Sequence, residues 1–163
     1  MLRNWLVVYT KPRHEKKSAS VLVSKGIEIF LPLKTELKQW SDRKKWVERP
    51  LFPGYLFVNI TELEYLDVLN SAGIVRFIFF NGKPAIVREK TIKELKLVLN
   101  TPDLHIETID LELNLGEIVS IKKGPFKGLE GRLIQFKGKN RISIEIECMQ
   151  KAVLVEIDKS YLN

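Results

Sequence analysis

Apolar residues in the first hundred positions occur either as short continuous runs or at a spacing of three to four residues. Continuous runs bounded by proline or glycine are typical of strands, and spaced runs are typical of helices that pack by one face. Strands are expected at residues 5–9, 27–31, 55–60, 74–80 and 85–87, and helices from Pro12 to Gly26, around Leu63 to Leu69 and around Ile92 to Leu99. Alternating strands and helices predict an α/β sandwich with a mixed or antiparallel sheet.

Two segments in this region are typical of hairpins. Residues 33–50 predict a protruding hairpin with its turn at residues 41–44, flanked by Trp40 and Trp46. Asn81-Gly82, between two apolar runs, predicts a tight two-residue turn because both residues tolerate a positive φ. The tryptophans and cations of the first hairpin suit single-stranded nucleic acid, and a solvated surface explains them equally well.

The pattern changes after residue 100. Residues 101–113 contain Pro102 and four acidic residues and are expected to form a linker. Short strands without a helical period follow, separated by turns rich in glycine, and they predict a small β-barrel. These strands are expected at residues 118–121, 129–136, 142–146 and 153–157. The fold class is therefore α+β, with domains at 1–100 and 114–163.

Charge is distributed unevenly along the chain. Residues 1–50 carry 12 basic and 5 acidic residues, a net charge of +7, which equals the net charge of the whole chain. Residues 101–113 carry four acidic residues and no basic one. A polyanionic partner would bind near the N-terminus, although a solvated basic surface has the same composition.

The chain offers little catalytic chemistry. Cys148 is the single cysteine, so an internal disulfide and a cysteine-based zinc site are excluded, and it is expected to be a strand-end or buried thiol. His14 and His105 are too far apart in sequence for metal-ligand spacing. We expect no cofactor and no enzymatic activity. The absence of a long apolar run and of a secretory signal pattern predicts a cytoplasmic protein without a membrane partner.

Residues 50–58, PLFPGYLFV, contain the sharpest local signal. Two prolines and a glycine predict a tight bend that presents Phe52 and Tyr55 ahead of a strand. A rigid aromatic side chain with a polar tip is a common anchor for a protein partner, and filling the core is the structural alternative.

Three N-terminal segments, WLVVYTKPRHEKK, PLFPGYLFV and GIVRFIFFNGKPAIV, resemble the NGN domain of NusG-type transcription factors. Residues 116–131, GEIVSIKKGPFKGLEG, resemble a KOW motif. Both motifs in this order are strongly specific. The resemblance implies an NGN-like domain at 1–100, with a mainly antiparallel sheet and flanking helices, joined to a KOW β-barrel. Within the family, the N-terminal segments look most like the specialised RfaH-like and UpxY-like antiterminators.

The resemblance implies partners and residues. The NGN surface of such proteins binds the clamp helices of the largest subunit of RNA polymerase, and by motif position Phe52, Tyr55 and Phe57 would belong to it. Lys11 and Lys17 would contact the non-template DNA strand, with Arg13 and His14 beside them. The KOW domain would bind a ribosomal protein or nascent RNA. The implied function is suppression of pausing and termination on specific operons.

Two departures bear on this function. Residues 64–67, EYLD, replace the polar histidine–threonine run of RfaH, which puts its second polymerase contact in doubt. Residues 147–151, ECMQK, replace a phenylalanine–glycine–arginine turn of general factors, which weakens the expectation that Rho is bound. The alternatives are a housekeeping NusG factor that recruits Rho and a KOW-type RNA-binding or ribosome-associated module.

Overall fold

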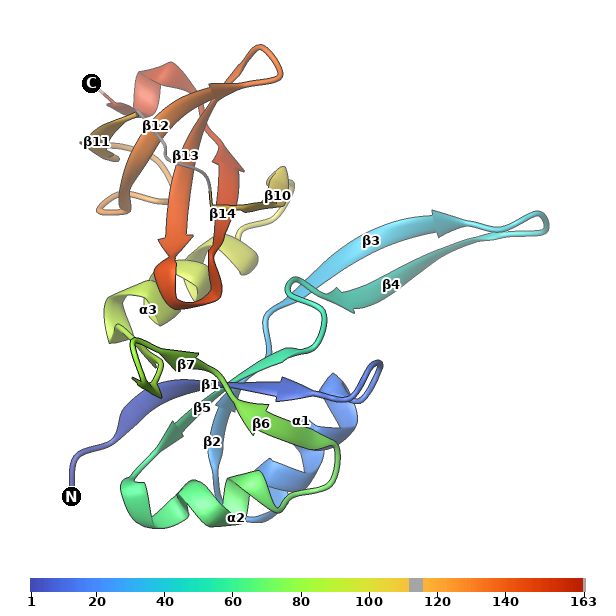
Figure 1. The fold of residues 1–163 in the computed structure, drawn as a ribbon. Coiled ribbons are helices and arrows are strands. Elements are labelled where there is room, and N and C mark those ends of the chain that lie inside the picture. Colours follow the sequence, from blue (N-terminus) through green and yellow to red (C-terminus); the bar gives the residue numbers. More distant parts are fainter. Residues whose placement is uncertain (112–115, 163) are drawn as a thin grey trace. The chain divides into compact units, whose positions relative to one another are not determined.

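A computed structural model describes residues 1–111 and 116–162, and the chain divides into two compact units, Met1–Arg88 and Glu89–Asn163 (Figure 1). The elements of the first unit are β1 (Asn4–Thr10), α1 (Glu15–Ser24), β2 (Glu28–Phe30), β3 (Leu33–Gln39), β4 (Lys44–Pro50), β5 (Tyr55–Ile60), the 3-10 turn η1 (Glu62–Glu64), α2 (Tyr65–Leu69), β6 (Ile74–Phe77), β7 (Phe79–Phe80), β8 (Lys83–Pro84) and β9 (Ile86–Val87). The elements of the second unit are α3 (Glu89–Leu99), β10 (Ile106–Asp110), β11 (Glu117–Ser120), β12 (Glu130–Phe136), β13 (Lys139–Ile146), η2 (Glu147–Met149), β14 (Lys151–Glu156) and η3 (Lys159–Leu162).

The first unit is built on an antiparallel sheet with the strand order β2-β5-β1-β6, in which β9 also pairs with β1. Because side chains alternate between the faces of a strand, Leu6 and Val8 of β1 share one face with Val58 and Leu56, their partners on β5. Helices α1 and α2 cover this face, and Leu22 of α1 is fully buried against it. The expected antiparallel sheet with flanking helices is confirmed.

Helix α1 begins later than expected. Pro12 does not open it, because Arg13 adopts a left-handed backbone conformation (φ +62°) and the helix starts at Glu15. Ala19 and Leu22 are buried, whereas Val23 of the same helix is exposed. The predicted C-terminus is correct: Gly26 follows the last turn at φ +78°, and the N–H of Ile27 donates to the carbonyl of Leu22.

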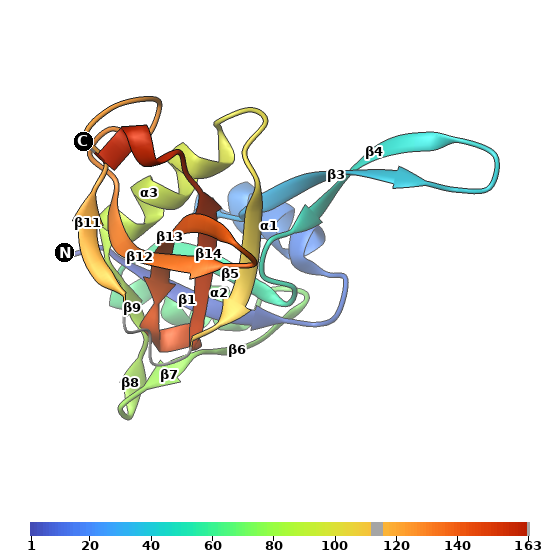
Figure 2. The same ribbon diagram turned by 90° about the horizontal axis from the view of Figure 1, so that it is seen from above.

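Both predicted hairpins are present. Strands β3 and β4 pair with each other alone and extend beyond the sheet and helix of the first unit (Figure 2). The turn between them is closed by the Trp40 N–H, which donates to the Arg43 carbonyl at 2.7 Å. Asn81 and Gly82 both have positive φ, as a two-residue turn between β7 and β8 requires.

The second unit is a five-stranded antiparallel sheet in the order β10-β14-β13-β12-β11. Strands β13 and β14 are buried on both faces: Ile142 and its cross-strand partner Val155 lie on one face and Leu154 lies on the other, and all three are fully buried. Strands β10 and β11 are the two edges of this sheet, and within residues 89–111 and 116–162 they are not paired with each other. The four strands expected beyond residue 114 are all present, which matches the β-rich half of the predicted α+β fold.

The expected boundaries differ from the compact units at two places. Helix α3, expected at the end of a domain spanning 1–100, belongs to the second unit, with Ile92, Leu95 and Val98 buried. The expected linker, 101–113, contains strand β10, because Ile106 is buried and the backbone pairs with β14. Its last two positions lie outside the described residues.

Candidate functional site

The segment Phe52 to Tyr55 forms a tight turn at the start of β5. The Tyr55 N–H donates to the Phe52 carbonyl at 3.0 Å, and Gly54 adopts φ +85°. Proline at the second position and a left-handed glycine at the third are the features of a type II turn. The Thr10 N–H donates to the Gly54 carbonyl at 2.8 Å, so the turn is tied to the end of β1.

The three aromatic residues of the motif differ in how far they are buried. Phe52 and Phe57 are buried, with ring centroids 6.4 Å apart, whereas Tyr55 is half-buried. The Tyr55 ring meets the Tyr9 ring edge-on at 5.5 Å, and the Arg76 guanidinium lies 5.7 Å from the Tyr9 centroid. Of the three predicted polymerase-binding residues, Tyr55 alone reaches the surface, and the two phenylalanines support it from the interior.

Sequence reasoning missed two supports of this turn. The buried carboxylate of Glu15, the first residue of α1, accepts a hydrogen bond from the Gly54 N–H at 2.8 Å. Tyr9 packs so closely that a Cβ on Gly54 would lie 2.8 Å from its ring. Both residues occur in the N-terminal family segment, yet only their contacts with Gly54, 39 and 45 positions away in sequence, give them a role.

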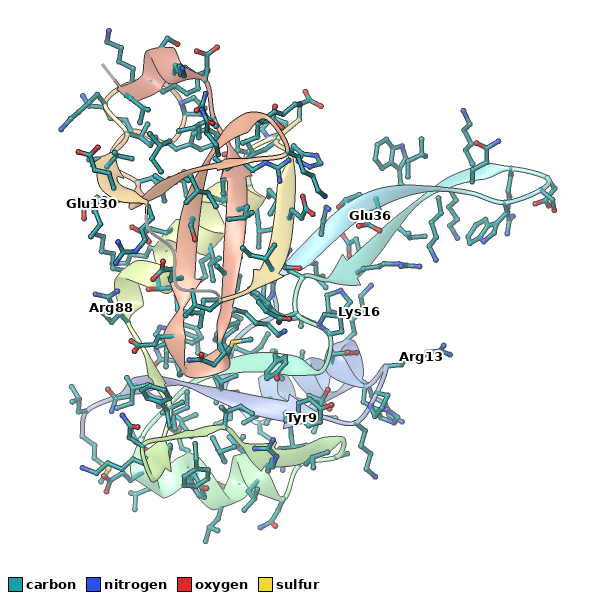
Figure 3. All side chains as sticks on the ribbon, turned by 45° about the horizontal axis from the view of Figure 1, so that its top comes forward. Tyr9, Arg13, Lys16, Glu36, Arg88 and Glu130 are labelled. Atoms are coloured by element: carbon teal, nitrogen blue, oxygen red, sulfur yellow. The ribbon has the colours of Figure 1, made fainter. Side chains whose placement is uncertain are left out.

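The basic loop, residues 11–14, lies next to this turn in the first unit. Lys11 and Arg13 of the loop and Lys17 of α1 are exposed, and Arg13 points outward in Figure 3. None of the three forms an ion pair with another described residue. The loop is anchored by the Lys11 N–H, which donates to the Gly73 carbonyl at 2.8 Å.

His14 differs from the other predicted DNA-binding residues. It is half-buried, and its Nδ1 lies 2.9 Å from the Pro12 carbonyl oxygen. The Ser18 N–H donates to its backbone carbonyl at 2.8 Å, so His14 closes the turn that starts α1. This placement gives His14 a structural role in the loop, whereas Lys11, Arg13 and Lys17 have no ion-pair partner in the described part of the chain.

The KOW-like segment packs tightly within the second unit. Ile121, Phe126 and Leu129 are buried, and Phe126 meets Tyr161 edge-on at 6.4 Å. A Cβ at Gly131 would lie 2.4 Å from the Ser143 carbonyl oxygen, so the glycine permits the close approach of β12 and β13. Cys148 lies in η2, just before β14, and burial raises the pKa of its thiol.

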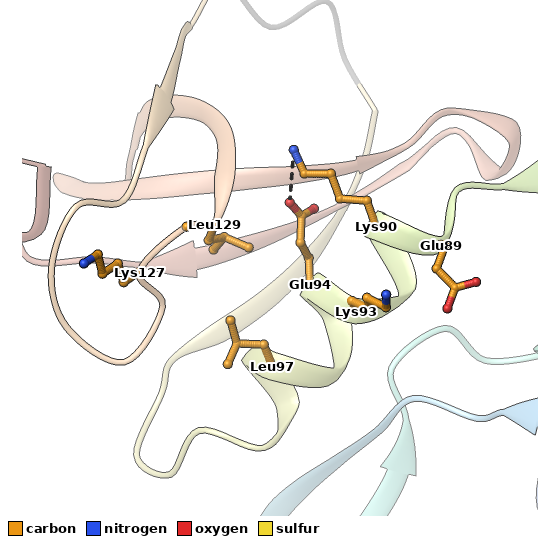
Figure 4. A pocket seen from close by; sticks show the side chains of 8 residues that line it. Glu89, Lys90, Lys93, Glu94, Leu97, Lys127 and Leu129 are labelled. Atoms are coloured by element: carbon orange, nitrogen blue, oxygen red, sulfur yellow. Dashed lines mark ion pairs between the residues drawn. The ribbon is translucent and has the colours of Figure 1, made fainter.

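A hollow of about 510 Å³ lies between α3 and the loop before β12 (Figure 4). The Lys90 ammonium lies 3.9 Å from the Glu94 carboxylate of the same helix and 2.7 Å from the Glu130 carboxylate of β12, and the hydrogen bond from Lys90 lowers the pKa of Glu130. Lys90 and Glu94, two of the charged lining residues, are therefore paired with each other. Its lining comprises Glu89, Lys90, Lys93, Glu94, Leu97, Lys127, Gly128 and Leu129.

Two further findings concern chemistry that a site could carry. Across the described ranges, no three His, Cys, Asp or Glu side chains come together in a way that could hold a metal ion. No helix in the same ranges is long and apolar enough to cross a membrane. His14 and His105 lie in different units.

The family model described as "Transcription termination factor nusG" matches residues 3–96, more than half of the chain and the whole of the turn and basic loop. The chain belongs to the NusG family. NusG of Lactococcus lactis subsp. lactis strain IL1403, a transcription termination/antitermination protein, is 24% identical over 96% of this chain and 90% of its own length. NusG of Staphylococcus aureus strain Mu50 is 25% identical over 96% of this chain and 92% of its own.

A solved structure of Thermotoga maritima NusG has the same fold, with a TM-score of 0.55 and 19% identity over 98% of this chain and 95% of that one. The predicted NusG-type family and the predicted α+β fold class are thus confirmed. This NusG-family chain is a transcription termination/antitermination factor. The narrower RfaH-like or UpxY-like placement, the binding residues and the domain boundaries stay predictions.

Proposed function

We propose that this NusG-family protein is an elongation and antitermination factor that binds the clamp helices of RNA polymerase and the non-template DNA strand. The observation that carries the proposal is the hydrogen bond from the Thr10 N–H to the Gly54 carbonyl, 2.8 Å long. This bond places the turn that presents Tyr55 directly beside the basic loop that begins at Lys11. A rigid aromatic anchor and unpaired cations on one surface suit a partner in which protein and DNA meet.

The mechanism requires no catalytic group. A protein that binds the active conformation of an elongating polymerase more tightly than the paused one shifts the population toward the active state. A difference of about 1.4 kcal/mol in binding free energy changes this equilibrium tenfold. In this proposal Tyr55 contributes affinity for polymerase, and Lys11, Arg13 and Lys17 hold the DNA backbone. The protein acts in the cytoplasm and not as an enzyme.

The restriction to specific operons is part of the proposal, with the second unit serving as an adaptor for a ribosomal protein or nascent RNA. The sequence at residues 147–151 supports the specialised role, because it departs from the turn of general factors. In the structure it forms η2 and a left-handed Gln150 at φ +52°. The alternatives are a housekeeping factor that recruits Rho and a KOW-type RNA-binding or ribosome-associated module.

Single-round transcription by the cognate polymerase, with and without the protein, tests the proposal. The template carries a pause site and a Rho-dependent terminator behind a plausible leader. Shorter pauses and increased read-through are expected. Increased termination in the presence of Rho would select the housekeeping factor, and no effect on any such template would select the RNA-binding module.

A further inference from the structure

The β3–β4 hairpin carries exposed aromatic surface that the fold does not use. Trp46 is 66% exposed, Trp40 is 42% exposed and Leu37 is 49% exposed. An isolated two-stranded hairpin is only marginally stable, and apolar side chains that remain in water do not stabilise it. A group of large apolar side chains left exposed is therefore informative. The hairpin therefore presents a surface that a partner would cover.

The strand register gathers this surface on the ribbon. Trp46 is directly opposite Leu37, so the two side chains share one face of the hairpin, and Lys44 lies on the same face two residues away. At the turn, the Arg43 guanidinium lies 5.4 Å from the Trp40 ring centroid. A cation therefore lies near each tryptophan: Arg43 beside Trp40, and Lys44 on the same face as Trp46.

The charge of the hairpin selects among partners. Residues 33–50 contain six basic and three acidic residues, a net charge of +3. Cations that alternate with aromatic rings match a strand whose phosphates are separated by flat bases, since each base offers a face for stacking. Covering the hairpin with a purely apolar protein surface would cost free energy, because its cations would be desolvated.

The base of the hairpin adjoins the basic loop. The Lys16 ammonium lies 3.3 Å from the Glu48 carbonyl oxygen of β4 and 3.9 Å from the Glu48 carboxylate. Lys16 stands beside Lys17 in α1, and Figure 3 shows Lys16 at the root of the ribbon. A strand held by Lys11 and Lys17 would therefore reach the hairpin by continuing along the same unit.

We propose that the β3–β4 hairpin binds single-stranded DNA by stacking unpaired bases on Trp46 and Trp40, as a continuation of the basic loop. This inference rests on the DNA contact in the proposed function, and it adds a second, aromatic part to that contact. The basic loop supplies charge, and the hairpin adds stacking to the charge of its own cations. Removing a stacking tryptophan should leave the salt dependence of binding unchanged, because stacking releases no counterions.

Fluorescence anisotropy with the full chain tests the proposal, using a labelled DNA single strand, the same strand as RNA and the corresponding DNA duplex. Trp46→Ala should weaken binding to the DNA single strand by roughly fivefold or more, with an unchanged dependence on salt. Trp46→Phe should retain most of the affinity, because phenylalanine also stacks. Leu63→Ala removes another exposed apolar side chain, outside the hairpin, and should have no effect.

A second measurement does not depend on folding of a variant. Of the three tryptophans, Trp5 is buried and the other two are in the hairpin. Addition of the DNA single strand to the unaltered protein should quench tryptophan fluorescence, and Trp46→Ala should reduce the quenching. No quenching, or wild-type affinity of Trp46→Ala, would overturn the proposal, as would binding confined to the RNA or the duplex.

The double variant Lys11→Ala/Lys17→Ala separates this inference from the proposed function. It should weaken binding and reduce the slope of log affinity against log salt by about 0.7 for each lost phosphate contact. If Lys11→Ala/Lys17→Ala weakened binding and Trp46→Ala did not, the DNA contact of the proposed function would stand and binding by the hairpin would be rejected. If the unaltered protein showed no antitermination in transcription while the DNA single strand still quenched its tryptophan fluorescence, the proposed function would be rejected and binding by the hairpin would stand.

Discussion

The carboxylate of Glu15 accepts a hydrogen bond from the backbone N–H of Gly54, with 2.8 Å between Oε1 and N. Glu15 is 6% exposed, and it joins the start of α1 to the turn that presents Tyr55. Because the turn also bonds to Thr10, the basic loop, the helix and the aromatic turn are held as one structural element.

Loss of this acceptor should destabilise the protein. In Glu15→Ala the buried Gly54 N–H has no partner, and the free energy of unfolding should fall by about 1–3 kcal/mol. Urea denaturation checks the change. Glu15→Gln keeps a side-chain oxygen of the same reach and should cost less than Glu15→Ala, so equal losses would contradict a role for the hydrogen bond.

The conformation of Gly54 leads to a second prediction. Gly54→Ala should lower the free energy of unfolding by about 2–4 kcal/mol, because the new Cβ adds a clash with the Tyr9 ring to the strain of a positive φ. Gly26→Ala is the matched control, since Gly26 also has a positive φ and has no atom within 4 Å of a Cβ. Its cost should be about 1 kcal/mol. Thermal unfolding of the two variants measures the difference.

The exposure of Tyr55 leads to a prediction for binding. Tyr55→Ala should weaken association with polymerase by about 1–3 kcal/mol, a common cost for truncating a partly buried aromatic anchor. Titration with the cognate polymerase measures it. Val75→Ala is a control, because Val75 is an exposed apolar residue of β6 outside the turn. Equal affinity of Tyr55→Ala and the unaltered protein would remove the turn from the proposed interface.

Strand β10 should respond to acid. Hydrogen bonds from Lys137 and then Arg141, at 2.9 and 2.7 Å, lower the pKa of Glu107 to about 2 from an ordinary value of 4.5. The resulting stability is fully present above pH 4.5 and is lost as the pH falls toward 2. Because the Glu107 side chain is 29% exposed, screening reduces the contribution to about 1–2 kcal/mol.

Denaturation measured between neutral and acidic pH checks this expectation. Glu107→Gln should lower stability at neutral pH and flatten the loss on acidification. Glu117→Gln changes an exposed carboxylate of β11 and serves as the control. A steep loss that persists unchanged in Glu107→Gln would assign the acid sensitivity to other groups.

Much of the fold could be predicted because local signals agreed with the final packing. The alternation of apolar residues in β1 and β5, the glycine after α1 and the Asn81-Gly82 turn each act over a few residues. Strand β10 was missed for the opposite reason. Glu107 is typical of a solvated linker when only its neighbours are considered, and its partner Arg141 is 34 positions away.

The features of the candidate site likewise divide into those that follow from local sequence and those that depend on distant contacts. The sequence by itself determined the family motifs, the tight turn at Pro53-Gly54 and the cluster of cations from Lys11 to Lys17, because these depend on residue type and local spacing. Only the tertiary structure decided that Tyr55 is half-buried and reaches the surface, while Phe52 and Phe57 are buried. The sequence does not contain that distinction, since the exposure of an aromatic ring depends on which distant side chains, here Tyr9 and Phe30, pack against it.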